Sequence, residues 1–149
     1  MENIISEISL VYERKKSSFE KITCSIDASE AARSFYLGNN AQMDLKEYFY
    51  VILLNRANQI LGYHKLSEGG ICGTVADIRL TFATALKSAS SGIILVHNHP
   101  SGQLKPSEQD IKLTRKFKEA GELLEVPVLD HIILTQQSYY SFSDNGALT

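Results

Sequence analysis

The chain has 149 residues, of which 44% are hydrophobic, and its 15 basic and 17 acidic side chains give a formal net charge of −2. This length fits one compact domain with its own core, and the near-neutral charge excludes a generally basic nucleic-acid-binding protein. The share of charged residues, 21%, together with 9% aromatic residues, argues against an intrinsically disordered chain.

Membrane insertion and secretion also find no support in the sequence. No apolar run approaches the roughly 18 residues that a membrane-spanning helix requires, and the N-terminus lacks the apolar segment of a signal peptide. The two cysteines, Cys24 and Cys72, cannot build a disulfide framework. We therefore expect a cytoplasmic protein with two reduced thiols, and we interpret Cys72 as a small packing residue.

We divide the chain into an N-terminal extension, residues 1–46, and a core, residues 47–146, of one domain. Weak alternation of apolar and polar residues predicts an edge strand at 8–12, and 19–26 is the candidate for a second strand. The charged stretch 14–18 between them is typical of a solvated loop.

A helix is predicted in the second part of the extension. Asp27 and Glu30 have the spacing of a capping box, which places the start of the helix near Ala28. Glycine and asparagine at 38–40 end it. The extension is thus expected to contribute strands and one helix that pack on the core.

The first half of the core alternates between strands and a helix. Aromatic and β-branched residues at 48–54 predict a buried strand, and 59–66 is expected to return as its hairpin partner. An N-cap signal at Asp77 and apolar residues at helical spacing predict a helix over 78–90. The apolar run 93–96 is typical of a central buried strand.

The second half continues in the same way. A loop at 97–106 leads into a helix predicted over 107–124, and strands follow at 128–134 and 139–142. This order of elements predicts an α/β domain with three layers, in which helices cover both faces of a mixed β-sheet.

Two histidines, His97 and His99, directly follow the strand predicted at 93–96. Residues two apart on an extended segment point to the same side, so the two imidazoles are suited to bind one metal ion. The Pro-Ser-Gly sequence that follows turns the chain sharply and places the pair on a tight loop. Two interpretations of Ser101 stay open: it lines a substrate cleft, or it closes this turn.

The third candidate ligand is Asp110, in the first turn of the helix predicted over 107–124. Ser107 lies three residues earlier and shares its face, and the dipole of a helix N-terminus keeps such a carboxylate ionised. Two histidines and one carboxylate leave a fourth position open, which is the arrangement of a catalytic zinc site. The spacing is also that of a capping box, which is the purely structural alternative for Ser107 and Asp110.

A general base beside the metal would complete a hydrolytic site, because the metal lowers the pKa of a bound water to about 7. Glu47, at the start of the strand predicted at 48–54, is the first candidate for this base. Glu68, in the loop after the second strand of the hairpin, is the second candidate. The residues alone leave peptide, other amide and ester substrates open.

Several short motifs surround these residues. The sequence Val-His-Asn-His-Pro-Ser-Gly occupies 96–102, Leu-Thr occupies 113–114, Leu-Asp-His-Ile-Ile occupies 129–133, and Tyr-Ser-Phe-Ser-Asp-Asn-Gly occupies 140–146. Together with Asp110 they resemble the RadC family, which belongs to the JAMM (MPN+) metalloprotease superfamily. The resemblance covers about two-thirds of the chain, and the spaced His-x-His, Ser and Asp residues make it specific.

This resemblance implies a cytidine-deaminase-like α/β/α fold and one Zn²⁺ ion, bound by His97, His99, Asp110 and a water. It implies that Glu47 activates this water and that Ser107 helps to hold the oxyanion that forms during attack on an amide. We expect no counterpart of the helical domain that precedes the JAMM domain in longer members of the family.

The leading hypothesis is a zinc metallopeptidase that cleaves a peptide or isopeptide bond in an unknown peptide or protein substrate. The alternatives are a non-catalytic interaction module that keeps the site, and a DNA-associated protein of the RadC type. The near-neutral charge gives nucleic acid little support as a partner. His131 is a further RadC-like residue, which we interpret as a buried core histidine, with a role in the site as the alternative.

Overall fold

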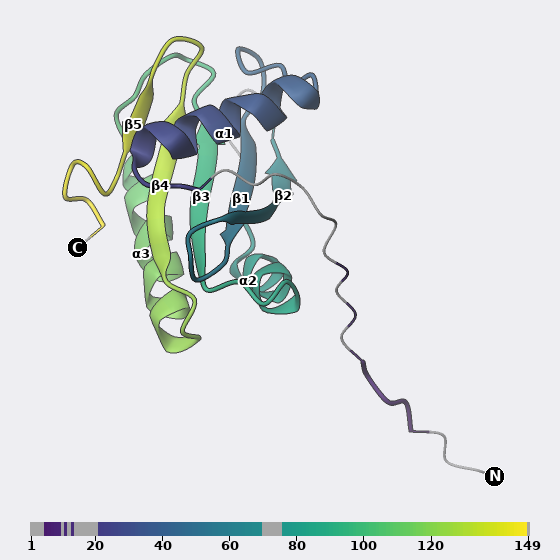
Figure 1. Ribbon diagram of the computed structural model, residues 1–149. Helices are drawn as coiled ribbons and strands as arrows, with labels where there is room; N and C mark the ends of the chain where they lie inside the picture. Colours follow the sequence, from purple (N-terminus) through teal and green to yellow (C-terminus); the bar gives the residue numbers. More distant parts are fainter. Residues whose placement is uncertain (1–4, 10, 12, 14–20, 70–75, 149) are drawn as a thin grey trace.

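The computed structural model describes residues 5–9, 11, 13, 21–69 and 76–148 of the chain. Within these residues, one sheet is formed by β1 (Tyr48–Leu54), β2 (Ile60–Glu68), β3 (Gly92–Asn98), β4 (Val128–Leu134) and β5 (Tyr139–Ser141). The helices are α1 (Ser25–Gly38), α2 (Ile78–Lys87) and α3 (Glu108–Leu123), and they pack against this sheet (Figure 1).

The sheet is mixed, as predicted, and its strand order is β2-β1-β3-β4-β5. β3 and β4 are parallel, whereas β1 pairs antiparallel with both β2 and β3, and β4 pairs antiparallel with β5. In the pairing of β1 with β3, Phe49 lies opposite His97. The start of β1 therefore lies beside the end of β3, at the edge of the sheet where both β3 and β4 end.

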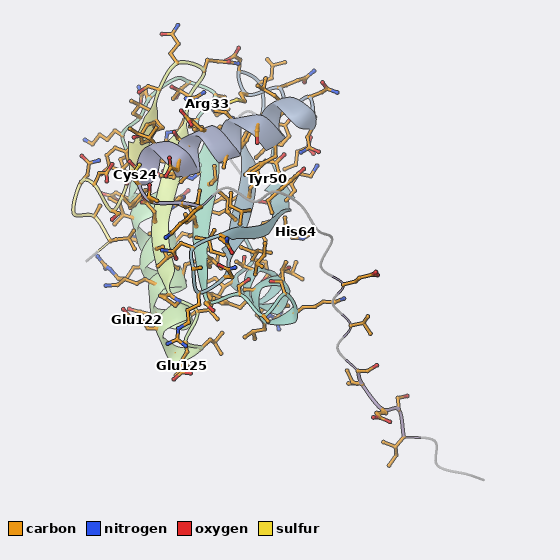
Figure 2. The ribbon with its side chains drawn as sticks, in the orientation of Figure 1. Cys24, Arg33, Tyr50, His64, Glu122 and Glu125 are labelled. Atoms are coloured by element: carbon orange, nitrogen blue, oxygen red, sulfur yellow. The ribbon has the colours of Figure 1, made fainter. Side chains whose placement is uncertain are left out.

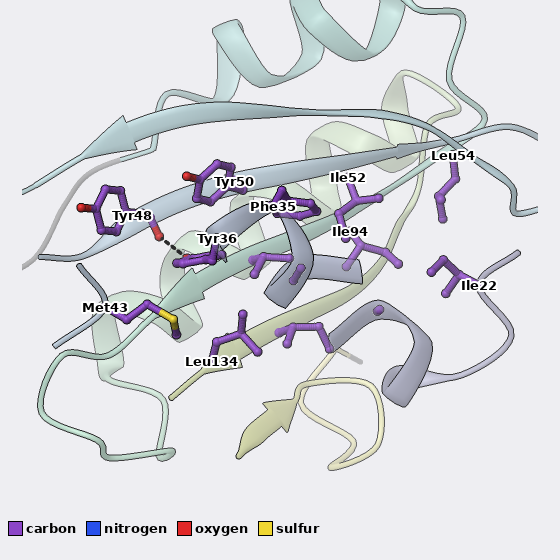
Figure 3. Packing of buried hydrophobic residues seen from close by; sticks show 14 residues of the cluster. Ile22, Phe35, Tyr36, Met43, Tyr48, Tyr50, Ile52, Leu54, Ile94 and Leu134 are labelled. Carbon is purple, nitrogen blue, oxygen red and sulfur yellow. Dashed lines mark hydrogen bonds between the residues drawn. The ribbon is translucent and has the colours of Figure 1, made fainter. Parts of the chain in front are cut away.

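Helices cover both faces of the sheet, which confirms the predicted three layers. α1 crosses one face, and α2 and α3 lie on the other (Figure 1). The α1-side cluster comprises Ile22, Ala28, Ala32, Phe35, Tyr36, Met43, Tyr48, Tyr50, Ile52, Leu54, Ile94, Val96, Ile132 and Leu134 (Figure 3). The cluster on the α2 and α3 side comprises Phe49, Val51, Leu53, Ala76, Phe82, Ala85, Ile93, Leu95, Phe117, Val126 and Val128.

Burial on both faces explains why β1 and β3 are uninterrupted apolar runs in the sequence. Every residue of these two strands is buried, so neither strand shows the alternation of a half-exposed strand. The α1 layer is joined to β1 by more than apolar contact, because the buried hydroxyl of Tyr36 donates a hydrogen bond to the carbonyl oxygen of Tyr48 at 2.9 Å (Figure 3).

The two strands predicted before residue 27 are wrong for the residues that the structure describes. Ile8 and Val11 are exposed and belong to no strand, and Lys21 forms one isolated bridge with Gln59. Alternation alone produces a strand only where a neighbouring strand offers hydrogen bonds, and the described part of 8–12 pairs with no strand. The predicted loop at 14–18 lies outside the described residues.

α1 begins three residues before the predicted start. Its N-cap is Cys24, and Asp27 lies in the first turn, where its carboxylate accepts hydrogen bonds from the backbone N–H and the hydroxyl of Thr23 at 2.8 and 2.6 Å. The acidic residue therefore stabilises the start of the helix from inside the first turn rather than from the cap position. The helix ends at Gly38, as predicted.

The remaining elements follow the prediction closely. Asp77 is the N-cap of α2, and its carboxylate accepts hydrogen bonds from the backbone N–H groups of Arg79 and Leu80. α2 ends at Lys87, earlier than expected, because Ala89 adopts a left-handed conformation with φ of 54°. Among the described residues, none of the helices combines the length and apolar character needed to cross a membrane.

Cys24 is a free thiol at the exposed start of α1 (Figure 2), and Cys72 lies outside the described residues.

Candidate metal centre

The predicted ligands meet where three elements end or begin. His97 is the penultimate residue of β3 and His99 follows the strand, while Glu47 directly precedes β1, which runs antiparallel to β3. The loop after His99 returns to the same edge and starts α3, whose first turn carries Asp110. Four side chains from three separate segments of the chain therefore converge at one edge of the sheet.

The donor atoms of Glu47, His97, His99 and Asp110 all lie within 4.8 Å of one another. The Nε2 atoms of the two histidines are 3.0 Å apart. Oδ1 of Asp110 lies 3.4 Å from Nε2 of His97, and Oδ2 lies 3.2 Å from Nε2 of His99. Oε1 of Glu47 lies somewhat farther away, 3.8 Å from Nε2 of His97.

This donor set fits a small divalent metal. Ligands at about 2.0–2.1 Å from a tetrahedral zinc ion are separated from one another by about 3.3–3.4 Å. The separations among His97, His99 and Asp110, 3.0 to 3.4 Å, are close to that value. Two imidazoles and one carboxylate in this arrangement can hold a metal ion and leave a further coordination position open.

A tight turn orients His99. Its Nδ1 lies 2.7 Å from the carbonyl oxygen of Gln103, and the N–H of Gly102 donates to the carbonyl of His99 at 3.0 Å. Gly102 has a φ of +82°, which a residue with a Cβ rarely adopts. The hydroxyl of Ser101 is exposed and accepts a hydrogen bond from the N–H of Gln103 at 3.3 Å, so Ser101 closes this turn.

Ser107 and Asp110 form the expected capping box at the start of α3. The Ser107 hydroxyl accepts a hydrogen bond from the N–H of Asp110 at 3.0 Å, and Oδ2 of Asp110 accepts one from the N–H of Ser107 at 2.8 Å. Oδ1 of Asp110 meanwhile faces His97. Oδ2 also lies 3.2 Å from Nε2 of His99. Capping and metal binding are compatible, because the capping box uses Oδ2 and leaves Oδ1 available to a metal ion.

The electrostatics of the cluster favour an ionised Asp110. Partial burial works against the charge, but hydrogen bonds and charge interactions with His97 and His99 hold the pKa of this carboxyl well below its usual range. Burial lowers the pKa of His99, but its contacts with Asp110 and the Gln103 carbonyl outweigh burial, and the net shift is upward. Burial beside the charge of Asp110 raises the pKa of Glu47, although the two histidines oppose this shift. A carboxylate with a raised pKa is better suited to accept a proton.

A chain of hydrogen bonds runs behind His97. Its Nδ1 lies 2.7 Å from Nε2 of His131, and Nδ1 of His131 lies 2.6 Å from the hydroxyl of Thr114. The Thr114 hydroxyl donates to the backbone carbonyl of Asp110 at 2.6 Å. The chain therefore joins two of the candidate ligands on the side away from the cluster.

His131 is fully buried, as the interpretation as a core histidine requires, yet it also contacts a candidate ligand. Phe49 stacks on His97 with ring planes 4° apart, and Phe142 stacks on His131 with planes 9° apart. Burial, and next the neighbouring His97, lower the pKa of His131 well below its ordinary value, so this ring is neutral.

Asn98 is a site residue that the sequence reasoning missed. It lies between the two histidines, is completely buried, and points to the α1 side of the sheet, where its oxygen accepts a hydrogen bond from the N–H of Tyr48 at 2.8 Å. Thr114 was missed in the same way. Both residues lie in the motifs at 96–102 and 113–114, but their partners become apparent only when the strands are paired.

Glu68 does not join the cluster. Its carboxylate forms ion pairs with Lys46 and Lys65 at 3.2 and 3.1 Å. The side-chain hydrogen bonds from Lys65 and Lys46 lower the pKa of Glu68. The exposed His64 on β2 (Figure 2) also lies outside the cluster. Of the two glutamates considered for the base, the fold therefore brings only Glu47 to the histidines.

Comparison with known proteins gives a consistent result. The family model described as "RadC-like JAB domain" matches residues 26–147. A UPF0758 protein of Flavobacterium johnsoniae is 50% identical over 100 residues, which is 67% of this chain and 44% of that protein. A UPF0758 protein of Salinibacter ruber is 35% identical over 136 residues, 91% of this chain and 56% of that protein. The chain spans about half the length of the curated relatives it matches.

Proposed function

This chain belongs to the RadC-like JAB domain family, and on that premise we propose that it is a zinc-dependent hydrolase of peptide or isopeptide bonds. The observation that carries the proposal is the convergence of Glu47, His97, His99 and Asp110 within 4.8 Å. The resemblance of the motifs around these residues to the JAMM metalloproteases supports the choice of amide over ester substrates.

In this proposal His97, His99 and Asp110 hold the zinc ion. When bound, the zinc supplies a water with a pKa of about 7 and polarises the carbonyl group under attack. The lowered pKa of Asp110 supports its role, because this carboxylate stays ionised without a metal and is ready for a cation.

Glu47 is the proposed general base. Oε1 of Glu47 lies 3.8 Å from Nε2 of His97. The raised pKa of Glu47 supports transfer of a proton from water to this carboxylate and then to the leaving amine. The backbone carbonyl of Glu47 accepts a hydrogen bond from the N–H of Gly69 at 2.8 Å, which holds the residue at the mouth of the β1–β2 hairpin.

Ser107 is proposed to stabilise the oxyanion. Its hydroxyl oxygen accepts the capping hydrogen bond from the N–H of Asp110, and this leaves the hydroxyl proton to donate to a substrate oxygen. A fixed donor of this kind is worth about 3 kcal/mol when charge develops on a carbonyl oxygen.

Metal analysis is the first test. We expect about one zinc ion per wild-type chain, and loss of that zinc in His97→Ala and Asp110→Ala. His64→Ala, which changes an exposed histidine outside the cluster, is the matched control and should retain the metal. A wild-type protein that binds no zinc, or ligand variants with unchanged metal content, would refute the proposed centre.

Hydrolysis is the second test, with a library of internally quenched peptides and a conjugate joined through a lysine isopeptide bond. Glu47→Gln should keep zinc and lose at least about 100-fold in rate, because the amide cannot accept the proton. Glu68→Gln should keep both properties, since its ion pairs lie outside the cluster. Activity that survives in the first variant but not in the second would move the base to Glu68. A wild-type protein that holds zinc but cleaves nothing would favour an interaction module.

A further inference from the structure

The hydrogen bonds behind His97 determine where protons lie on two imidazole rings. Thr114 has a single hydroxyl proton, and it donates that proton to the carbonyl of Asp110 at 2.6 Å. The Thr114 oxygen can therefore only accept from Nδ1 of His131, 2.6 Å away. Nδ1 of His131 must carry a proton.

The second nitrogen of His131 then acts as an acceptor. The ring is completely buried and stacks on Phe142, and among the described residues its two nitrogens hydrogen-bond with Thr114 and His97. The printed hydrogen bonds of the ring nitrogens go to a neutral hydroxyl and to another imidazole, and neither offers a negative charge to a cationic ring, so the neutral form with a bare Nε2 is favoured. This Nε2 accepts a hydrogen bond from the Nδ1–H group of His97 at 2.7 Å.

We propose that His131 and Thr114 are positioning residues that fix His97 in the tautomer with a proton on Nδ1 and a lone pair on Nε2. That lone pair points at the other candidate ligands, with Nε2 of His99 at 3.0 Å and Oδ1 of Asp110 at 3.4 Å. An imidazole can bind a metal only through a nitrogen without a proton. His131 and Thr114 thus prepare His97 before any metal arrives.

The same series of hydrogen bonds also connects two of the candidate ligands, His97 and Asp110. Its last hydrogen bond ends on the backbone carbonyl of Asp110, so one continuous path links the ring of His97 to the first turn of α3. Hydrogen-bond partners of metal ligands of this kind typically change metal affinity by about 10–100-fold when they are removed. The proposal rests on the metal site of the proposed function.

Thr114→Val removes the hydroxyl and keeps the shape of the side chain. Without that acceptor, His131 is free to place its proton on Nε2 and donate it to His97, which moves the proton of His97 onto Nε2, where it blocks the metal. We expect zinc affinity, measured by competition with a chromophoric chelator, to fall by about 10–100-fold. Thr114→Ser retains the hydroxyl and should bind zinc as the wild type does.

His131→Phe tests the other link, because the phenyl ring keeps the stacking on Phe142 but offers no acceptor to His97. We expect a similar loss of zinc affinity. His64→Phe, on the exposed part of β2, is the control that should leave affinity unchanged. Thermal unfolding of each variant separates a loss of fold from a loss of affinity.

The tautomer can be observed without metal. In ¹⁵N-labelled, metal-free wild-type protein at mildly alkaline pH, correlation of imidazole ¹H and ¹⁵N shifts should show a protonated Nδ1 and a bare Nε2 on His97, and Thr114→Val should mix the two tautomers. A wild-type His97 with its proton on Nε2, or folded Thr114→Val protein with unchanged shifts and zinc affinity, would overturn the proposal. This readout judges the proposal even if the wild type proves to bind no zinc.

Discussion

The side-chain oxygen of Asn98 accepts a hydrogen bond from the backbone N–H of Tyr48 at 2.8 Å. This bond connects Tyr48, which directly follows Glu47, to the end of β3. The amide nitrogen of Asn98 donates to the carbonyls of Met43 and Lys46 at 2.9 and 2.8 Å. The residue between the two histidines therefore holds the segment that carries the proposed base.

Asn98→Ala should lower both stability and hydrolysis. The substitution leaves the N–H of Tyr48 and two carbonyls without their buried partner, and we expect the free energy of unfolding in urea to fall by about 2–4 kcal/mol. The rate should fall further than the folded fraction, because Glu47 is no longer held in place. Asn39→Ala, at the exposed end of α1, is the control and should change stability by less than about 1 kcal/mol. An Asn98 variant as stable as this control would show that the contacts contribute nothing.

Zinc should stabilise the fold through the same cluster. A ligand at 100 times its dissociation constant adds about 2.7 kcal/mol to the free energy of unfolding, and thermal unfolding should show a corresponding rise in Tm. Removal of the metal with a chelator should reverse that rise. His99→Ala should abolish it, whereas His64→Ala should preserve it, because His64 lies outside the cluster. An equal rise in the His99 variant would place the zinc elsewhere.

Much of the candidate site could be predicted because its parts are local in the sequence. The spacing of His97 and His99 and the capping box of Ser107 and Asp110 each lie within four residues, and regular backbone geometry fixes their relative directions. The bounds of β1 were equally clear, since its apolar run is continuous and buried on both faces.

The parts that could not be predicted depend on contacts between distant segments. The meeting of His131 with His97 requires the parallel register of β3 and β4, and no local spacing encodes that register. The strand expected at 19–26 failed for a related reason, because Thr23 and Asp27 form a local hydrogen-bonded helix start there instead. Local hydrogen bonds thus start a helix where a strand was expected.

At Gly121, α3 closely approaches the segment that follows it. A Cβ at Gly121 would lie 2.5 Å from the carbonyl oxygen of Val126, which is backbone and cannot turn aside. Gly121→Ala should therefore lower the free energy of unfolding by about 1–3 kcal/mol, measured by urea denaturation. Gly38→Ala, which meets nothing within 4 Å, should be neutral or slightly stabilising because alanine favours a helix. Equal effects of the two substitutions would contradict the close approach.

Asp130 gives the fold a specific dependence on pH. Its buried carboxylate accepts hydrogen bonds from the hydroxyl of Ser141 at 2.6 Å and from the N–H groups of His131 and Ser143 at 2.7 and 3.0 Å. Burial raises the pKa of this carboxyl above its ordinary value of 3.8, although these hydrogen bonds oppose the shift. The folded protein therefore retains this proton at a pH where the unfolded chain has already lost it.

The sign of the effect follows from that difference. As the pH rises above 3.8, the unfolded chain ionises first, so Asp130 makes the protein less stable until the folded carboxyl has also ionised. Asp130→Asn removes this titration, and its stability relative to the wild type should increase with pH over that window, by about 1.4 kcal/mol for each unit of pKa difference. Urea denaturation of both proteins from about pH 4 to about pH 7 measures the slope.

Ser141→Ala should steepen the wild-type dependence, because it removes a hydrogen bond that lowers the pKa of Asp130. If the stability of the Asp130→Asn variant relative to the wild type instead falls with pH, the carboxyl ionises more readily in the fold than in the unfolded chain.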